Sequence, residues 1–209
     1  RLSAVTDSDE VVLTGTKRHV AFASAADRLV VLARGEAGID LYLLDPRADG
    51  VTLTLQRTVA GDTQYRVDMD GVRVPRTNRI GASGTGWATW HAVMLDALVL
   101  VAARAVGAAE AVHALTTDYA RERHQFGKPI AAFQAISHSL ADGITAIDGA
   151  RVLVHRAAWT RDVDRPIETL APMAKMFATQ TCREVAGAAI QIHGGMGFTL
   201  AVSYTHLRA

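Results

Sequence analysis

The spacing of hydrophobic residues changes near residue 80 of the chain. Before this point, short runs of alternating apolar and polar residues are separated by turn-forming residues. These runs are "EVVLTGTKRHVAF", "RLVVLAR", "IDLYLLD", "VTLTLQ" and "YRVDMDGVRVP". Alternation with a period of two is typical of strands that bury one face. Five or six short strands at this spacing predict an antiparallel, β-barrel-like domain over residues 1–80.

Glycine-containing pairs mark the turns that we expect between these strands. Gly15-Thr16 can close a tight turn, and Asp70-Gly71 is typical of a hairpin turn between two alternating strands. The segment "RTNRIGASGTG", residues 76–86, is rich in glycine and small polar residues. Such a composition predicts a linker to a second domain.

After the linker, hydrophobic residues recur at the three- and four-residue spacing of amphipathic helices. We expect three helices, over residues 87–124, 133–161 and 169–192. The apolar stripe of the second helix is formed by Ile136, Leu140, Ile144, Ile147 and Val154. Long helices joined by short connections predict an antiparallel helical bundle over residues 81–200, so the expected fold class is α+β.

The composition is that of an ordinary globular protein, with 49% hydrophobic and 21% charged residues among 209. A net charge of +1 gives no general attraction to nucleic acids, which we therefore do not expect as partners. One stretch, residues 92–109, is apolar enough to raise the question of a membrane span. Asp96 and Arg104 lie inside it, and both would be costly at the centre of a bilayer. We therefore interpret it as a buried helix of a soluble protein.

Cysteine and histidine usage gives no sign of a disulfide or a metal site. Cys182 is the only cysteine, so an intramolecular disulfide is impossible, and we expect a cytoplasmic protein. No histidine base stands at helical spacing from Cys182, which favours a packed small residue over a nucleophile. The histidines show no metal-ligand spacing with acidic or cysteine partners, so we expect no metal site.

The stretch "RERHQFGKPI", residues 121–130, concentrates cations at the predicted end of the first helix. The cationic or titratable residues are Arg121, Arg123, His124 and Lys128. Gly127 can provide a left-handed C-cap, and Pro129 blocks continuation of the helix. One interpretation is that the cations complement the negative end of the helix dipole. The other is that an arginine binds phosphate oxygens while Phe126 packs on a flat ring.

A second stretch, "VAGAAIQIHGGMGFT", ends the third predicted helix in a cluster of glycines. A helix precedes the cluster, so it is not the dinucleotide-binding fingerprint that follows a strand. Gly194, Gly195 and Gly197 either cap the helix or let main-chain N–H groups approach a ligand. Gln191, one turn earlier, could hydrogen-bond the same ligand.

Together these stretches resemble one family. "YARERHQFGKPIAAFQAISHSLADG" and "AKMFATQTCREVAGAAIQIHGGMGFT" are similar to the C-terminal helical domain of the acyl-CoA dehydrogenases, and "VVLTGTKRHVAFASAADRLVVLAR" and "VDMDGVRVP" to its middle β-domain. The resemblance runs from about Asp9 to Thr199 and is that of a divergent, actinobacterial-type member. Relative to the family, the N-terminal domain and the extreme C-terminus are missing, and residues 201–209 are set apart as a tail of doubtful origin.

The resemblance implies an FAD site shared between subunits. In the family, the residue matching Arg123 reaches the FAD diphosphate of a neighbouring subunit, and the one matching Phe126 packs close by. The glutamine of the F-Q pair also lies at the cofactor, and the Q-I-H-G-G segment lines its adenine-nucleotide side. The implied cofactor-binding residues are Arg123, Phe126, Gln134, Gln191, Ile192, His193, Gly194 and Gly195. A homo- or hetero-oligomer, in the family typically a dimer of dimers, is expected.

The implied reaction is the α,β-dehydrogenation of an acyl-CoA, of fatty or steroid origin, with electrons passing through FAD to an electron-transfer acceptor. In the family the base is usually a glutamate C-terminal to the glycine motif, in a segment that this sequence does not reach. Some members place it on the long helix instead, where this chain has no glutamate and Asp96 aligns imperfectly, so the catalytic residue is unassigned. His19-Val20-Ala21-Phe22 replaces a flavin-facing aromatic-Ile-Thr-Asn/Ser run. An alternative is therefore a non-catalytic subunit that completes a partner's FAD site. A third possibility is a relative that uses the fold for monooxygenation.

Overall fold

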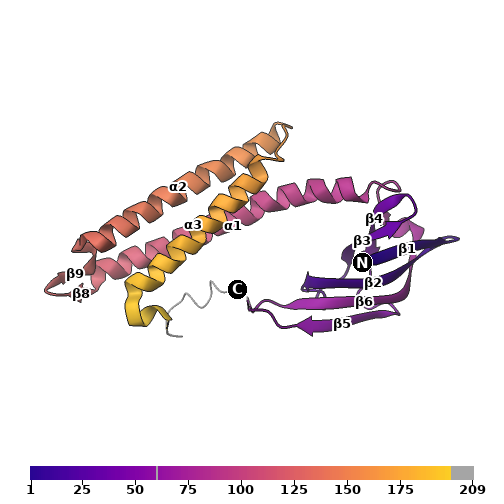
Figure 1. Ribbon diagram of the computed structural model, residues 1–209, viewed down its shortest axis with the longest axis horizontal. Helices are drawn as coiled ribbons and strands as arrows, with labels where there is room; N and C mark the ends of the chain where they lie inside the picture. Colours follow the sequence, from indigo (N-terminus) through magenta and orange to yellow (C-terminus); the bar gives the residue numbers. More distant parts are fainter. Residues whose placement is uncertain (60, 199–209) are drawn as a thin grey trace. The chain divides into compact units, whose positions relative to one another are not determined.

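The computed structural model describes residues 1–59 and 61–198, so the predicted tail at 201–209 lies outside the described residues. The chain forms two compact units. The first, Arg1–Val93, contains the sheet, and the second begins at Met94 and contains the helices (Figure 1). The α+β class predicted from the sequence is therefore confirmed.

Unit 1 contains one seven-stranded sheet with the order β5-β6-β2-β1-β3-β4-β7. Its strands are β1 (Leu2–Asp7), β2 (Glu10–Ala21), β3 (Leu29–Gly35), β4 (Gly38–Leu44), β5 (Val51–Gln56), β6 (Gln64–Pro75) and β7 (Arg79–Ile80). All neighbouring pairs are antiparallel except β1 and β3, which run parallel. The expectation of a wholly antiparallel, barrel-like sheet is therefore corrected. After the β1–β2 hairpin, the chain crosses over so that β3 pairs with the free edge of β1, which makes the sheet mixed. The sheet is open because its two edge strands, β5 and β7, do not pair with each other.

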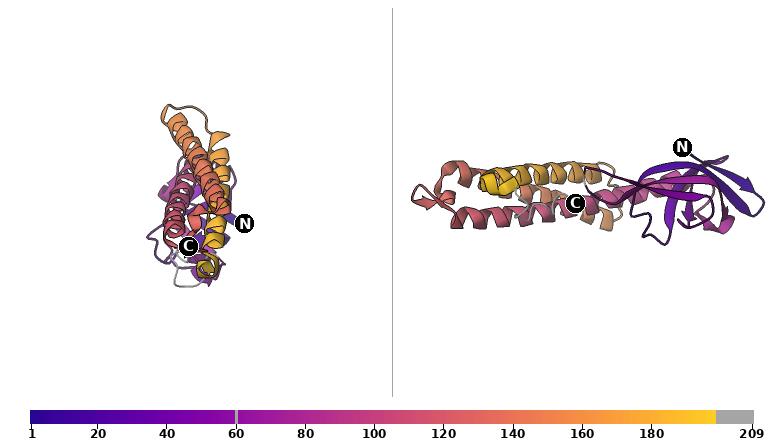
Figure 2. Two further views of the ribbon diagram at one scale, coloured as in Figure 1. Left: turned by 90° about the vertical axis from the view of Figure 1, so that its left-hand side faces the viewer. Right: turned by 90° about the horizontal axis from the view of Figure 1, so that it is seen from below.

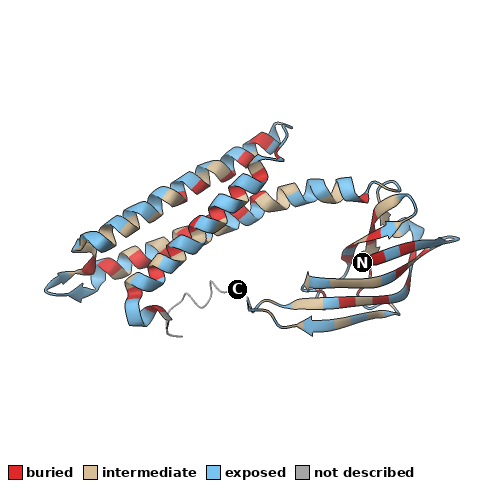
Figure 3. Ribbon diagram, in the orientation of Figure 1, coloured by how far each residue is buried: buried red, intermediate tan, exposed pale blue. Residues whose placement is uncertain are grey.

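Alternate residues of the long strands form the core of unit 1, as the period-two pattern predicts (Figure 3). Val11 and Leu13 of β2 pair with Val74 and Val72 of β6, and all four side chains are buried. Paired residues of antiparallel strands point to the same face, so these positions define the inner face of the sheet. Lys17 follows on the same face, paired with the fully buried Val67.

Two glycine-containing pairs that were expected at turns lie inside strands instead. Gly15 is within β2, where a Cβ atom would lie 2.1 Å from the carbonyl oxygen of Arg1. Its lack of a side chain thus permits the close approach of β1. Asp70 and Gly71 are within β6, at a register shift where the partners of β2 pass from Met69 to Val72. This pair therefore forms a β-bulge rather than a hairpin turn.

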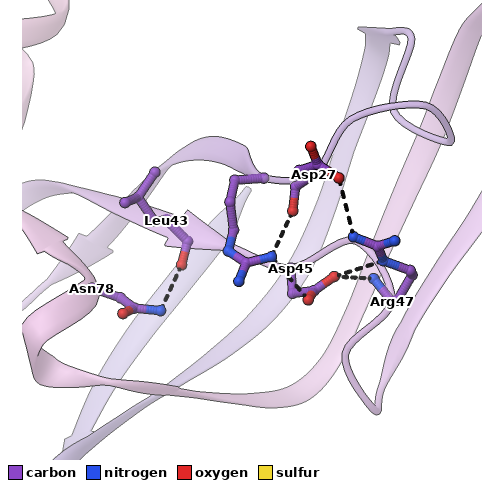
Figure 4. A network of polar contacts seen from close by, with 6 residues as sticks. Asp27, Leu43, Asp45, Arg47 and Asn78 are labelled. Carbon is purple, nitrogen blue, oxygen red and sulfur yellow. Dashed lines mark hydrogen bonds and ion pairs between the residues drawn. The ribbon is translucent and has the colours of Figure 1, made fainter.

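Polar contacts hold the end of β4 and the segment that leaves the sheet (Figure 4). The Asp45 carboxylate binds Arg28 at 3.0 Å and Arg47 at 3.3 Å. The amide of Asn78, in the 3-10 helix η1 (Arg76–Asn78), donates to the carbonyl oxygen of Leu43 at 3.2 Å. The predicted linker is thus anchored to β4 where it begins.

Unit 2 is a helical bundle whose helices match the predicted ranges within two residues. The elements are α1 (Gly86–Glu122), β8 (His124–Gln125), β9 (Lys128–Pro129), η2 (Ile130–Ala132), α2 (Gln134–Asp162), α3 (Leu170–His193) and η3 (Gly194–Phe198). α1 starts in unit 1 and continues into the bundle. α2 and α3 run side by side in opposite directions (Figures 1 and 2). Small buried residues such as Ala150, Ala174 and Ala178 allow these helices to pack closely.

α1 is exposed along much of its length. Val99, Val106 and Val112 are buried in the bundle core, whereas Leu100 is 71% exposed. By length and composition alone the helix could cross a membrane. Of its most apolar stretch of 18 residues, 22% is buried inside the structure. A core helix of a soluble protein passes the same test, so the expected absence of a membrane span stays a prediction.

Candidate functional site

The cation-rich stretch folds into a β-hairpin after α1, which ends at Glu122. We expected Gly127 to be the C-cap of the helix, and this prediction is wrong. Gly127 instead shares a two-residue turn with Phe126. Both have positive φ values, 55° for Phe126 and 79° for Gly127. Two positive φ values in a row match the twist of a hairpin, which explains why the chain turns here.

Phe126 presents an aromatic ring at the tip of this hairpin. A non-glycine residue with positive φ is uncommon and costs about 1–3 kcal/mol. Its side chain is 91% exposed, and its ring meets Phe133 edge-on with centroids 6.1 Å apart. The ammonium group of Lys128 lies 4.3 Å from the centre of the same Phe133 ring. Phe133 thus supports both sides of the hairpin, while Phe126 faces outward.

The four cationic or titratable residues of this stretch differ in their contacts within the chain. Arg121, in the last helical turn, pairs with Asp118 at 3.7 Å. Lys128 packs on Phe133, and the Nδ1 atom of His124 lies 2.9 Å from a main-chain carbonyl oxygen. Arg123 forms no ion pair with any described residue, and its side chain is exposed. Among these four residues, Arg123 is thus the one whose side chain no described residue engages.

The backbone of Arg123 is held firmly although its side chain is exposed. Its N–H donates to the carbonyl oxygen of Tyr119 at 2.9 Å, and its own carbonyl accepts from the N–H of Ile130 at 2.8 Å. These bonds attach the residue to α1 on one side and to the end of the hairpin on the other. A backbone that is already fixed removes the cost of ordering this part of the main chain when the guanidinium binds a ligand.

The glycine segment at the end of α3 combines two structural glycines with one that packing does not require. Gly194 has a positive φ of 57°, and a Cβ atom on Gly197 would lie 2.4 Å from the carbonyl oxygen of Ile190. Gly195 has neither constraint, because a Cβ atom there would meet nothing within 4 Å. Open space beside an exposed glycine leaves its main chain accessible to a ligand.

One aromatic contact joins the two segments. The ring of Tyr119, one turn before Arg123, stacks on His193 with centroids 4.1 Å apart and planes 18° apart. Because α3 runs opposite to α2, its C-terminal end lies at the end of the bundle where the hairpin lies (Figures 1 and 2). The structure therefore brings the two sequence motifs together within unit 2.

The predicted cofactor-binding residues fall into an exposed and an interior group. The exposed residues are Arg123, Phe126, Gln134, Gln191, Gly194 and Gly195. Ile192 is half-buried and lines an interior cavity of about 20 Å³, and His193 is buried. The Nδ1 atom of His193 lies 2.8 Å from the Ala189 carbonyl oxygen, which can only accept, so Nδ1 carries the proton. The interior position of these two residues suits a supporting role, and ligand contact by any of the predicted residues stays a prediction.

Asp96, the weak candidate for a catalytic base, is engaged in an ion pair between helices. Its two carboxylate oxygens accept from Arg161 of α2 at 2.7 and 3.3 Å. These hydrogen bonds raise the pKa of the Arg161 guanidinium. A carboxylate with both oxygens bound by arginine is a poor proton acceptor, so the geometry favours a structural role for Asp96.

Unit 1 contains a cavity of about 440 Å³ whose walls include Lys17, His19 and Trp90. Lys17 points to the inner face of the sheet, and burial lowers the pKa of its ammonium group. It forms no ion pair or hydrogen bond with a described residue. His19 is fixed by Gln64, whose amide oxygen lies 2.9 Å from Nδ1. The sequence could have revealed Lys17, because it occupies an inward position in the alternation of β2.

Cys182 has the environment of a packed residue. It is half-buried beside the bundle core, and burial raises the pKa of its thiol. A raised thiol pKa lowers the fraction of reactive thiolate at neutral pH.

The sequence and the fold of this chain are similar to those of known proteins. Residues 84–208 match the family model described as "Acyl-CoA dehydrogenase, C-terminal domain". A probable acyl-CoA dehydrogenase of Bacillus subtilis, YngJ, is 35% identical over 204 residues, which cover 93% of this chain and 54% of the relative. The chain thus spans about half the length of the curated relatives it matches.

Solved structures show the same fold. Butyryl-CoA dehydrogenase from Megasphaera elsdenii superposes with a TM-score of 0.94 at 31% identity, over 100% of this chain and 57% of that one. A chain of the ChsE4-ChsE5 complex from Mycobacterium tuberculosis gives a TM-score of 0.85 at 28% identity, over 95% and 53% respectively.

Proposed function

The chain belongs to the acyl-CoA dehydrogenase family, and we propose that the complete protein is an FAD-dependent acyl-CoA dehydrogenase. Its substrate would be an acyl-CoA thioester, which loses hydrogens from its α and β carbons. FAD, when bound, would supply the hydride acceptor, and an electron-transfer protein would reoxidise it. Among the observations, Arg123 carries most of the proposal, because it is an exposed cation on a fixed backbone and forms no ion pair within the part of the chain that the structure describes.

The residues present at the end of the bundle fit a ligand that carries phosphates and flat rings. An arginine fork matches phosphate oxygens, and an exposed aromatic ring offers a surface for stacking. Arg123 and Phe126 supply these two features from the same hairpin. Gly195 leaves main-chain groups accessible at the end of α3. The work of this chain at such a site would be to hold and orient the diphosphate end of the cofactor.

We propose further that the FAD is bound chiefly by another subunit of an oligomer. Phe126 projects away from its own bundle, which suits contact with a second chain. The helices also expose large apolar side chains, including Met176 at 61% and Leu100 at 71%. Exposed apolar surface of this kind marks association sites. A dimer of dimers, homomeric or heteromeric, would cover it.

Two features of the residues present favour the second candidate, a non-catalytic subunit of a heteromeric enzyme. On the long helix, Asp96 is held by Arg161 through both carboxylate oxygens, so it is poorly placed to act as a base. Ala21 stands where the family places a flavin-facing hydroxyl, so that hydrogen bond is lost. Such a subunit would donate Arg123 and the glycine segment to a partner's FAD without performing the chemistry.

Flavin content of the full-length protein, purified alone and after co-expression with its genomic neighbours, tests both candidates. Stoichiometric FAD in the protein alone, bleached by an acyl-CoA without oxygen, is expected for a dehydrogenase. Flavin only on co-expression, at about one per two chains, would instead establish the partner-subunit role.

Two arginine variants test the site itself. Arg123→Gln should weaken FAD binding by about 1.5–3 kcal/mol, the usual worth of a hydrogen bond to a charged group. Arg121→Gln is the matched control. Because Arg121 already pairs with Asp118, this variant should leave the affinity for FAD unchanged. Equal affinities for wild type and Arg123→Gln would refute the assignment of Arg123.

A further inference from the structure

We propose that Tyr119 and His193 form a positioning pair, which fixes Arg123 and the glycine segment, residues 194–197, at the spacing that one ligand requires. The inference rests on the proposed function, because it assumes that both segments bind the same FAD. Neither ring needs to touch the ligand. Their role is to connect two stretches that are about 70 residues apart in sequence.

The stacked rings have little freedom to move. Their planes are 18° apart at a centroid distance of 4.1 Å, so the faces lie almost parallel. His193 is buried, and the hydrogen bond from Nδ1 to the Ala189 carbonyl oxygen fixes the rotation of its ring. Tyr119 is half-buried on the last turns of α1. Each ring therefore restrains the helix to which the other belongs.

On the α1 side, the restraint reaches Arg123 through the main chain. The carbonyl oxygen of Tyr119 accepts the N–H of Arg123 at 2.9 Å. The carbonyl of Arg123 in turn accepts the N–H of Ile130, where the hairpin returns. A displacement of Tyr119 would therefore shift the backbone from which the guanidinium extends.

On the α3 side, the restraint reaches the glycine segment directly. Gly194 follows His193, and its N–H donates to the carbonyl oxygen of Gln191. Three residues later, Gly197 packs against the carbonyl of Ile190 so closely that no Cβ atom would fit. The segment is thus folded back onto the turn of α3 that carries His193, and it moves with that turn.

The first test compares variants that keep or remove each ring in the full-length protein, using reconstitution of the apoprotein with FAD. Tyr119→Leu and His193→Leu should weaken FAD binding by about tenfold, since misplacing a charged contact loses part of its energy. Tyr119→Phe retains the stacked ring and leaves the hydrogen bond of His193 in place, so it should stay within about threefold of wild type. Equal losses in Tyr119→Phe and Tyr119→Leu would overturn the proposal.

A double-mutant cycle separates positioning from a general loss of stability. If Tyr119 acts by placing Arg123, then Arg123→Gln should cost clearly less affinity in the Tyr119→Leu background than in the wild type. If the stack only stabilises the bundle, the two losses multiply, and the proposal is wrong. Methionine, which keeps apolar volume without a ring, replaces leucine if a leucine variant does not fold.

The outcomes also distinguish this inference from the proposed function. If Arg123→Gln binds FAD normally, both the proposed site and the positioning pair are refuted. If Arg123→Gln binds FAD weakly but its loss of affinity and that of Tyr119→Leu multiply in the double variant, the site is supported and only the positioning pair is refuted.

Discussion

Two isoleucines of α2 provide a matched test of how the bundle is stabilised. Ile147 is 0% exposed in the core between the helices, whereas Ile144, one turn earlier, is 40% exposed. The sequence places both in the same apolar stripe. We therefore compare Ile147→Ala with Ile144→Ala, which remove the same atoms from the same helix.

The expected magnitudes follow from burial. At Ile147, truncation loses the full transfer energy of the removed carbons and leaves a cavity in a close-packed core, for a total of about 3–4 kcal/mol. At Ile144, solvent already covers two-fifths of the side chain and can fill the space that truncation leaves, so about 1 kcal/mol is expected. The change in helix propensity is nearly the same in both variants and cancels in the comparison.

The assay is urea unfolding of the purified protein, with the midpoint and slope recorded separately. A difference of about 2 kcal/mol or more between the variants supports the reasoning. Equal costs at the two positions would refute it for the protein as purified, and would mean that another surface covers Ile144. Repeating the measurement over a range of protein concentrations shows whether that surface is a second chain.

Two further predictions concern the fold. Burial lowers the pKa of Lys17, so the unfolded chain binds this proton more tightly, and the stability of unit 1 should rise as pH increases toward the ordinary value of 10.5. Lys17→Met should have a larger free energy of unfolding than wild type at pH 7, and the difference should shrink toward pH 10.5. Denaturation curves that give the same difference at every pH would contradict this prediction. Gly86→Ala should destabilise the protein by about 2 kcal/mol or more, because the new Cβ would lie 2.5 Å from the backbone of Asp40. Its control on the same helix, Gly107→Ala, meets nothing within 4 Å and should stabilise by up to about 1 kcal/mol, so thermal shifts of the same sign would refute this.

Long-range regularity made the helices predictable from sequence. A three- and four-residue spacing marks the apolar stripe of the second helix from Ile136 to Val154, and the observed bounds of α1, α2 and α3 agree with the predicted ranges within two residues. The strands β2 to β6 were also visible from their alternation, whereas β1 and the two-residue β7 were not among the predicted strands. The order of the strands was not visible, because the parallel contact of β1 with β3 depends on where the chain crosses after β2. Local alternation contains no information on that crossing.

The glycines were the weakest part of the sequence-based description. A glycine indicates that a side chain is absent, but not whether a turn, a bulge or a close approach requires this. Gly15 serves a close approach, Gly71 a bulge and Gly127 a hairpin turn, although we expected a turn, a turn and a helix cap. For Gly15 and Gly71 the pairing with another strand separates these cases, and for Gly127 the end of α1 at Glu122 does.

The two interpretations of the cation-rich stretch, dipole complementation and anion binding, apply differently to its residues. Complementing the helix dipole accounts for Arg121, which lies in the last turn of α1. It extends to Arg123, the first residue after the helix ends at Glu122, but not to Lys128 on the returning strand β9, because dipole effects fall off within one turn. Lys128 has a partner in Phe133, so its charge is used within the chain. Arg123 combines a fixed backbone with an exposed charge that no described residue pairs, so we propose an anion from outside the chain as its partner.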